Sequence, residues 1–211
     1  MNWTPYQTFT DNIQRAERFV ALYKRNSKGK GRGRTTIMDT DILRAGVVFL
    51  HSTVEEYLRT IIRERKIKML QDDSKWSDVL SEVSLPGKNS GKSSGSKMNL
   101  SDLSAFKDLK VFDMVKEALN DKISYMTFNN YSQIVASLKT VEIDLSEETI
   151  DHKSINDYIE RRHKIVHEAD KNTLSGRGNH RTRPINVIQL ELWITAIKSF
   201  IEIVNNKCSD K

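Results

Sequence analysis

Residues 155–170, INDYIERRHKIVHEAD, are the most informative stretch of the chain. An advance of about 100° per residue, the spacing of an α-helix, places Ile159, Val166 and Ala169 within about 40° of Ile155. This apolar stripe predicts an amphipathic helix that packs one face against the rest of the protein. Ser154 precedes the stripe, and because serine commonly caps helix N-termini, we expect it to cap this helix.

Arg162 falls at about 340° on the same wheel, in the middle of the apolar stripe. A guanidinium does not lose its charge by deprotonation, so at this position it needs a carboxylate partner or a hydrated cleft. One interpretation is a buried ion pair with Glu55 or Glu56 of a neighbouring helix. The other is a functional arginine that faces a cleft.

His163 and His167 lie at about 80° and 120°, on one shoulder of the predicted helix. With Asp170 at about 60°, they are also compatible with a metal hydrolase. The HExxH pattern of zinc proteases is absent because Lys164 follows His163. We therefore predict no metal, and for His167 a purely structural role is the ordinary alternative.

Helical spacing of apolar residues continues on both sides of this stretch, and strand patterns are scarce. The three prolines, Pro5, Pro86 and Pro184, lie at expected boundaries. The predicted helices cover residues 7–25, 40–70 with Asp39 or Thr40 as the cap, 102–123, 129–140, 155–170 and 185–206. The expected fold is an all-α bundle of four to six helices.

The length of 211 residues suits one domain. Within it we expect an N-terminal helix and basic loop at residues 1–36, a core at 40–206 and a flexible insert at 84–101. No stretch has the roughly 18–20 apolar residues of a membrane span, and the N-terminus lacks the pattern of a signal peptide. Cys208 is the single cysteine, which excludes an intramolecular disulfide. These features predict a cytoplasmic protein without a membrane partner.

The net charge of +6 is unevenly distributed. Residues 24–34, 86–97 and 171–183 carry six, three and four basic residues and no acidic one, which leaves −7 for the rest of the chain. Such basic, glycine-, serine- or asparagine-rich segments are expected to meet a polyanion first, although solvated loops are the ordinary alternative. The candidate contact residues are Lys28, Lys30, Arg32, Arg34, Arg177, Arg181 and Arg183.

Residues 162–167, RHKIVH, resemble the motif of the HEPN superfamily, in which an arginine is followed after four to six residues by a histidine. Residues 42–59 resemble the first core helix of these domains, and residues 131–145 resemble the helical stretch before the motif helix. The helix after Pro184 resembles the last one. The similarity covers about residues 40–206 and is nearest to bacterial proteins of the RiboL-PSP-HEPN type and of one other bacterial HEPN type.

The resemblance implies a metal-independent endoribonuclease that needs no cofactor and works as a homodimer. It assigns catalytic roles to Arg162 and His167 and a supporting role to His163, where asparagine is commoner. Glu55 and Arg59 resemble an acidic-x3-basic pattern of some HEPN families, although they also suit an exposed helical ion pair. An imidazole can move the proton of the attacking RNA 2′-OH, and a guanidinium can hold the phosphate.

The resemblance also implies partners and an alternative function. RNA is the expected substrate, and an antitoxin or regulatory protein is a further expected partner, in antiviral defence or a toxin–antitoxin system. Some members no longer cleave RNA and act as dimeric modules that bind RNA or a partner protein. The presence of both Arg162 and His167 favours the enzyme.

Overall fold

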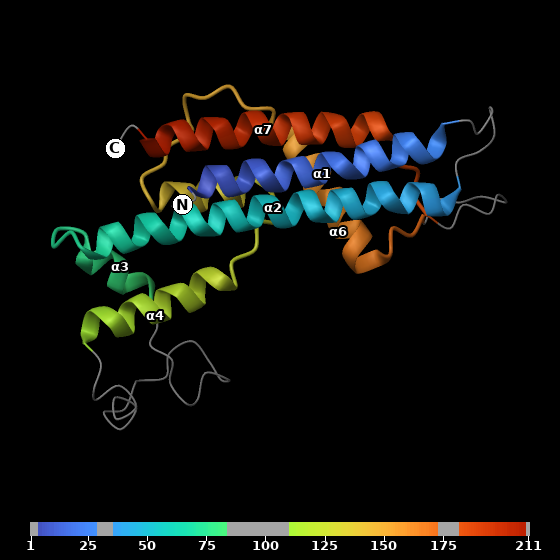
Figure 1. The fold of residues 1–211 in the computed structure, drawn as a ribbon. Helices are drawn as coiled ribbons and strands as arrows, with labels where there is room; N and C mark the ends of the chain where they lie inside the picture. Colours follow the sequence, from blue (N-terminus) through green and yellow to red (C-terminus); the bar gives the residue numbers. More distant parts are fainter. Residues whose placement is uncertain (1–3, 29–35, 84–109, 173–181, 210–211) are drawn as a thin grey trace. The chain divides into compact units, whose positions relative to one another are not determined.

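The computed structural model describes residues 4–28, 36–83, 110–172 and 182–209. These residues form seven α-helices (Figure 1): α1 Pro5–Ser27, α2 Ile37–Leu70, α3 Trp76–Glu82, α4 Val111–Ser124, α5 Tyr131–Lys139, α6 His152–Glu168 and α7 Val187–Ser209. The same residues contain no β-strand, apart from an isolated antiparallel bridge between Lys171 and Thr182. The predicted all-α class is confirmed, with seven helices rather than four to six.

The helices divide between two compact units. The first lies within residues 1–58 and 127–211 and the second within residues 59–126, so α2 begins in one and ends in the other. The insert expected at residues 84–101 lies outside the described residues. The single-domain organisation therefore stays a prediction. Within the described ranges, no helix is long and apolar enough to cross a membrane.

Three helices of the first unit, α1, α7 and the N-terminal part of α2, pack along one another (Figure 1). Their apolar stripes are buried, and the aromatic ring of Phe9 on α1 contacts that of Tyr57 on α2 at a centroid distance of 5.4 Å. Gly46 lies where α2 meets both other helices. A Cβ there would come within 2.8 Å of Leu190 Cδ2 and 3.1 Å of Phe19 Cβ, so this close approach requires glycine.

Helices α5 and α6 complete the first unit. The side chain of Asn130 caps α5 by accepting a hydrogen bond from the backbone of Gln133. Asn156 on α6 accepts one from the backbone of Tyr131 at 2.8 Å, which ties the start of α5 to α6. The Tyr131 ring packs edge-on against Phe200 of α7 at 6.1 Å. Helix α6 is thereby fixed against neighbours from distant parts of the chain.

The second unit holds the end of α2, α3 and α4. Lys66 is only 2% exposed and pairs with Glu82 at 2.7 Å. Trp76 of α3 stacks on Phe112 of α4 at a centroid distance of 6.2 Å. Helix α3, which is only seven residues long, has no counterpart among the predicted helices. The part of the predicted helix 102–123 that precedes residue 110 lies outside the described residues.

The start of α2 differs from the prediction. Thr36 and Asp39 form a reciprocal capping box: the Thr36 backbone donates to Asp39 Oδ2 at 3.1 Å, and the Asp39 backbone donates to Thr36 Oγ1 at 3.2 Å. The helix therefore starts at Ile37 rather than at residue 40. Asp39 does take part in the cap, but from inside the first turn.

Candidate functional site

Helix α6 carries the RHKIVH motif and starts earlier than predicted. Asp151, not Ser154, is its N-cap: Asp151 Oδ1 accepts a hydrogen bond from the backbone of Ser154 at 3.0 Å. The hydrogen bonds from Ser154 also hold the pKa of the Asp151 carboxyl below its usual range. The helix ends at Glu168, and both Ala169 and Asp170 then adopt the left-handed conformation, with φ of 48° and 55°.

The buried face of α6 is shorter than the helical wheel predicted. Ile155, Tyr158 and Ile159 are buried, but Val166 is 45% exposed and Ala169 is also exposed. Arg162 is partly exposed and follows the buried positions by one turn. It therefore lies where the buried face of α6 ends, not in the middle of an apolar stripe.

The structure places a buried polar cluster beside Arg162. His51 and Glu55 lie one turn apart on α2, with His51 Nε2 3.2 Å from Glu55 Oε1. Neither imidazole nitrogen has a hydrogen bond of good geometry to any described residue. The His51 ring is 5.9 Å from that of Tyr158. Burial raises the pKa of the Tyr158 hydroxyl, the Glu55 charge raises it further, and the Arg162 charge opposes this.

Tyr158 is thus within electrostatic reach of both Glu55 and Arg162, and its ring contacts that of His51. The Nε of Arg162 and the hydroxyl of Tyr158 are both buried, and neither has a hydrogen-bond partner within the part of the chain that the structure describes. Among the described residues, Arg162 does not form the ion pair with Glu55 or Glu56 that the sequence left open. Its positive charge acts on the Tyr158 hydroxyl in the direction opposite to that of the Glu55 carboxylate.

His163 and His167 are exposed on another side of α6. Their rings contact each other, with centroids 4.6 Å apart. Arg162 and His167 are five residues apart, which places them about 140° apart around the helix axis. Within one chain, the two predicted catalytic side chains therefore project in different directions.

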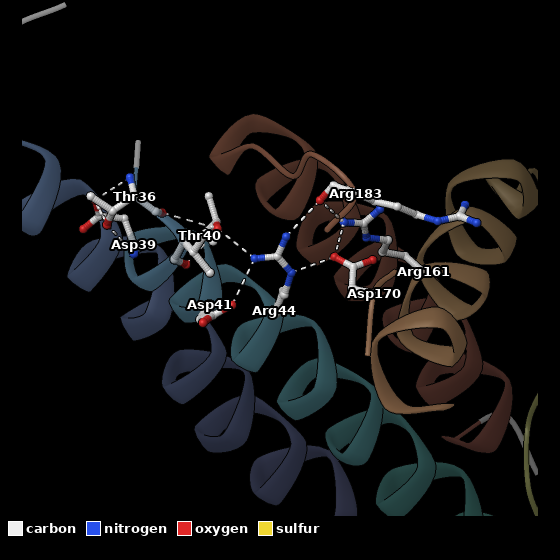
Figure 2. A network of polar contacts seen from close by, with 9 residues as sticks. Thr36, Asp39, Thr40, Asp41, Arg44, Arg161, Asp170 and Arg183 are labelled. Atoms are coloured by element: carbon white, nitrogen blue, oxygen red, sulfur yellow. Dashed lines mark hydrogen bonds and ion pairs between the residues drawn. The ribbon is translucent and has the colours of Figure 1, made fainter. Parts of the chain in front are cut away.

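Asp170 does not lie on the histidine shoulder, because α6 ends before it. Its side chain is 1% exposed, and its Oδ2 accepts from Arg44 Nε and from Arg161 Nη2, each at 2.6 Å (Figure 2). Two guanidinium groups therefore hold the carboxylate that the metal interpretation required. Among the described residues, no group of three histidine, cysteine or acidic side chains could hold a metal ion.

The network around Asp170 extends to the segment before α7. The carbonyl of Arg183 accepts from Arg44 Nη2 at 2.8 Å and from Arg161 Nη2 at 3.0 Å (Figure 2). Arg183 Nε donates to the carbonyl of Lys171 at 3.2 Å. Arg183, predicted as an RNA contact, therefore also has a structural contact within the chain.

The other basic candidates are mostly not described. Lys28 is exposed at the C-terminal end of α1. Five candidates lie outside the described residues: Lys30, Arg32, Arg34, Arg177 and Arg181.

Sequence reasoning missed four residues around the motif: His51, Tyr158, Arg44 and Arg161. A signal existed for His51, since it lies four residues after Val47 on the apolar stripe of α2 and four before Glu55. For Arg44 no such signal existed, because its partner Asp170 is 126 residues away in the sequence.

The family model RiboL-PSP-HEPN matches residues 10–210 of this chain. No curated protein and no solved structure matches the chain.

Proposed function

The chain belongs to the RiboL-PSP-HEPN family, and on this basis we propose that it is a metal-independent endoribonuclease that cleaves RNA through attack of the 2′-OH. Arg162 and His167 are its catalytic residues, and His163 and Glu55 support them. The observation that carries the proposal is the partly exposed Arg162 at the end of the buried face of α6, whose Nε has no hydrogen-bond partner among the described residues. Such a group is ready to bind a phosphate.

The two residue types divide the chemistry between them. An exposed imidazole such as that of His167 can take the proton from the RNA 2′-OH or return one to the leaving 5′-oxygen. The planar fork of Arg162 can hold two phosphate oxygens and offset the charge that builds up in the transition state. Because RNA carries its own nucleophile, the products are a 2′,3′-cyclic phosphate and a 5′-hydroxyl.

We propose that the active form is a homodimer. Arg162 and His167 project from different sides of α6, so a second copy can bring its own residues to a shared cleft. Light scattering coupled to gel filtration should give twice the chain mass of 24.3 kDa at tens of micromolar protein. A monomer under these conditions would exclude a shared site.

The decisive experiment incubates the purified protein with end-labelled total and transfer RNA, with and without EDTA. We expect cleavage that EDTA does not prevent, cyclic-phosphate product ends, and resistance of an RNA with 2′-O-methyl groups at the cut sites. His167→Ala should lose on the order of 10²–10⁴ in rate. His152→Ala is the matched control, since His152 is another exposed histidine of α6. It should retain the wild-type rate.

Two other outcomes would replace this proposal. RNA binding without cleavage would indicate a silent HEPN dimer that binds RNA or a partner protein, such as an antitoxin or regulatory protein. Cleavage that EDTA abolishes would indicate a metal hydrolase. Action in antiviral defence or a toxin–antitoxin system is part of the proposal and predicts toxicity on expression that His167→Ala removes.

A further inference from the structure

The C-terminal end of α6 has an unusual backbone. Ala169 and Asp170 are consecutive non-glycine residues in the left-handed region. Side chains with a Cβ rarely adopt this conformation, which persists only where surrounding contacts impose it. The backbone N–H groups of Ala169 and Asp170 both donate to the carbonyl of Lys164, that of Asp170 at a nitrogen–oxygen distance of 2.9 Å. These hydrogen bonds close the last turn of α6. His167 lies in this last turn.

The contacts that impose the turn converge on Asp170 (Figure 2). Its buried carboxylate joins Arg161 of α6 to Arg44 of α2. Its carbonyl accepts from the backbone of Arg183 at 2.9 Å. The end of α6 is thereby tied to α2 and to the segment that leads into α7.

Arg44 fixes the other end of the network. Its Nη1 donates to Thr40 Oγ1 at 2.7 Å and to Asp41 Oδ1 at 3.0 Å, both on α2 (Figure 2). Residues of its own helix therefore hold the guanidinium of Arg44 in one orientation, independently of its contact with Asp170. A rigid donor of this kind can set where the acceptor lies, rather than follow it.

The charges make Asp170 necessary for this arrangement. Burial lowers the pKa of Arg161, the nearby charges of Arg44 and Arg183 lower it further, and only Asp170 raises it. Without the carboxylate, the guanidinium groups of Arg44 and Arg161 would repel each other in a poorly hydrated place. Loss of the charge of Asp170 should therefore separate these groups and release the last turn of α6.

We propose that Asp170 is a positioning residue that holds His167 in place by locking the last turn of α6 onto α2 through Arg44. The proposal rests on the proposed function, since it assigns the catalytic proton transfer to His167. Asp170 itself does not touch the substrate. Its effect on cleavage should therefore appear in kcat rather than in KM.

The test compares Asp170→Asn with the matched control Glu160→Gln. Both changes replace a carboxylate by its amide, but Glu160 is exposed and pairs with Lys164 of the same helix. We expect Asp170→Asn to lower kcat by about 10²-fold, the effect of misplacing a catalytic group by about 1 Å, with KM little changed. Glu160→Gln should match the wild type in both constants.

A second readout does not depend on activity. In histidine-labelled protein, nuclear Overhauser effects should report the contact between the His163 and His167 rings, whose centroids are 4.6 Å apart. Asp170→Asn should weaken this contact while circular dichroism still shows a folded protein, and Glu160→Gln should preserve it. Arg44→Lys, which keeps a positive charge but cannot donate to both the Asp170 carboxylate and the Arg183 carbonyl as the guanidinium does, should weaken it as well.

The outcomes separate this proposal from the proposed function. If the wild type does not cleave RNA, the proposed function fails, and the ring contact alone then decides whether Asp170 holds His167. The positioning role would be overturned if Asp170→Asn kept both the contact between the His163 and His167 rings and the kcat of the wild type. Failure of both Asp170→Asn and Arg44→Lys to fold would also overturn it, because the network would then be a requirement of the fold.

Discussion

Replacement of Arg162 separates a catalytic arginine from a structural one. A buried ion pair that loses one partner costs about 3–5 kcal/mol, because the other charge stays buried and unpaired. In this structure the carboxylate of Glu55, the partner considered from the sequence, is 13% exposed and has His51 Nε2 at 3.2 Å, so it keeps a polar neighbour when Arg162 is removed. We therefore expect Arg162→Ala to lower the free energy of unfolding by only about 1 kcal/mol, an average value for a point substitution.

The same substitution should have a much larger effect on cleavage. Loss of a group that stabilises transition-state charge costs about 10²–10³ in kcat. Arg162→Lys should not restore the rate, because an ammonium lacks the planar fork that binds two phosphate oxygens. Arg18→Ala, at an exposed position of α1, is the matched control and should leave kcat and stability close to the wild-type values.

Urea unfolding and RNA cleavage must be measured on the same samples. A small loss of stability with a large loss of kcat supports a catalytic Arg162. A loss of about 3–5 kcal/mol together with full activity in the folded fraction would refute the reasoning and identify Arg162 as a structural ion-pair partner.

Three further predictions concern the rest of the chain. Neutralising Lys28, Lys30, Arg32 and Arg34 together should flatten the dependence of log affinity on log salt by about 0.7 per lost contact to single-stranded RNA. Turnover at saturating RNA should change little, and its collapse would place this segment in the active site. Gly46→Ala should lower the free energy of unfolding in urea by about 1–3 kcal/mol, since the new Cβ overlaps Leu190. An unchanged urea midpoint would mean that the side chains of Leu190 and Phe19 can move aside without cost. Asp151→Ala should lower the Tm at neutral pH. Because the pKa of Asp151 is lowered in the folded state, the difference in Tm from the wild type should shrink as the pH falls below the ordinary aspartate value of 3.8. A difference in Tm that does not depend on pH would contradict the capping role.

Helical periodicity predicted most helices because the signal is local. The stripes of α1, α2 and α7 are long, and each repeats over several turns, so their type was clear without any knowledge of the fold. Helix α3 has seven residues and a single buried one, Val79, which is too short a stretch for a period to emerge. The helix starts were less certain because Thr36 and Asp151 cap from positions where other polar residues follow closely.

The candidate site was predictable where it depended on local spacing and on the family motif. The placement of Arg162 and of the two motif histidines on one helix followed from the sequence. Glu55 was also named from the sequence, as a candidate supporting residue on another helix. The wheel was wrong for Asp170, because it assumed that the helix continued past Glu168. A helical wheel contains no information on where tertiary contacts stop a helix.

The sequence by itself determined the helical class, the motif helix and the family, because helical periods and a six-residue motif are properties of neighbouring positions. Only the tertiary structure decided that Asp170 joins Arg44 to Arg161 and that the charges of Glu55 and Arg162 both act on Tyr158. Arg44 and Asp170 are 126 residues apart, and they meet because a buried charge needs a partner, which only the packing of the helices brings within reach.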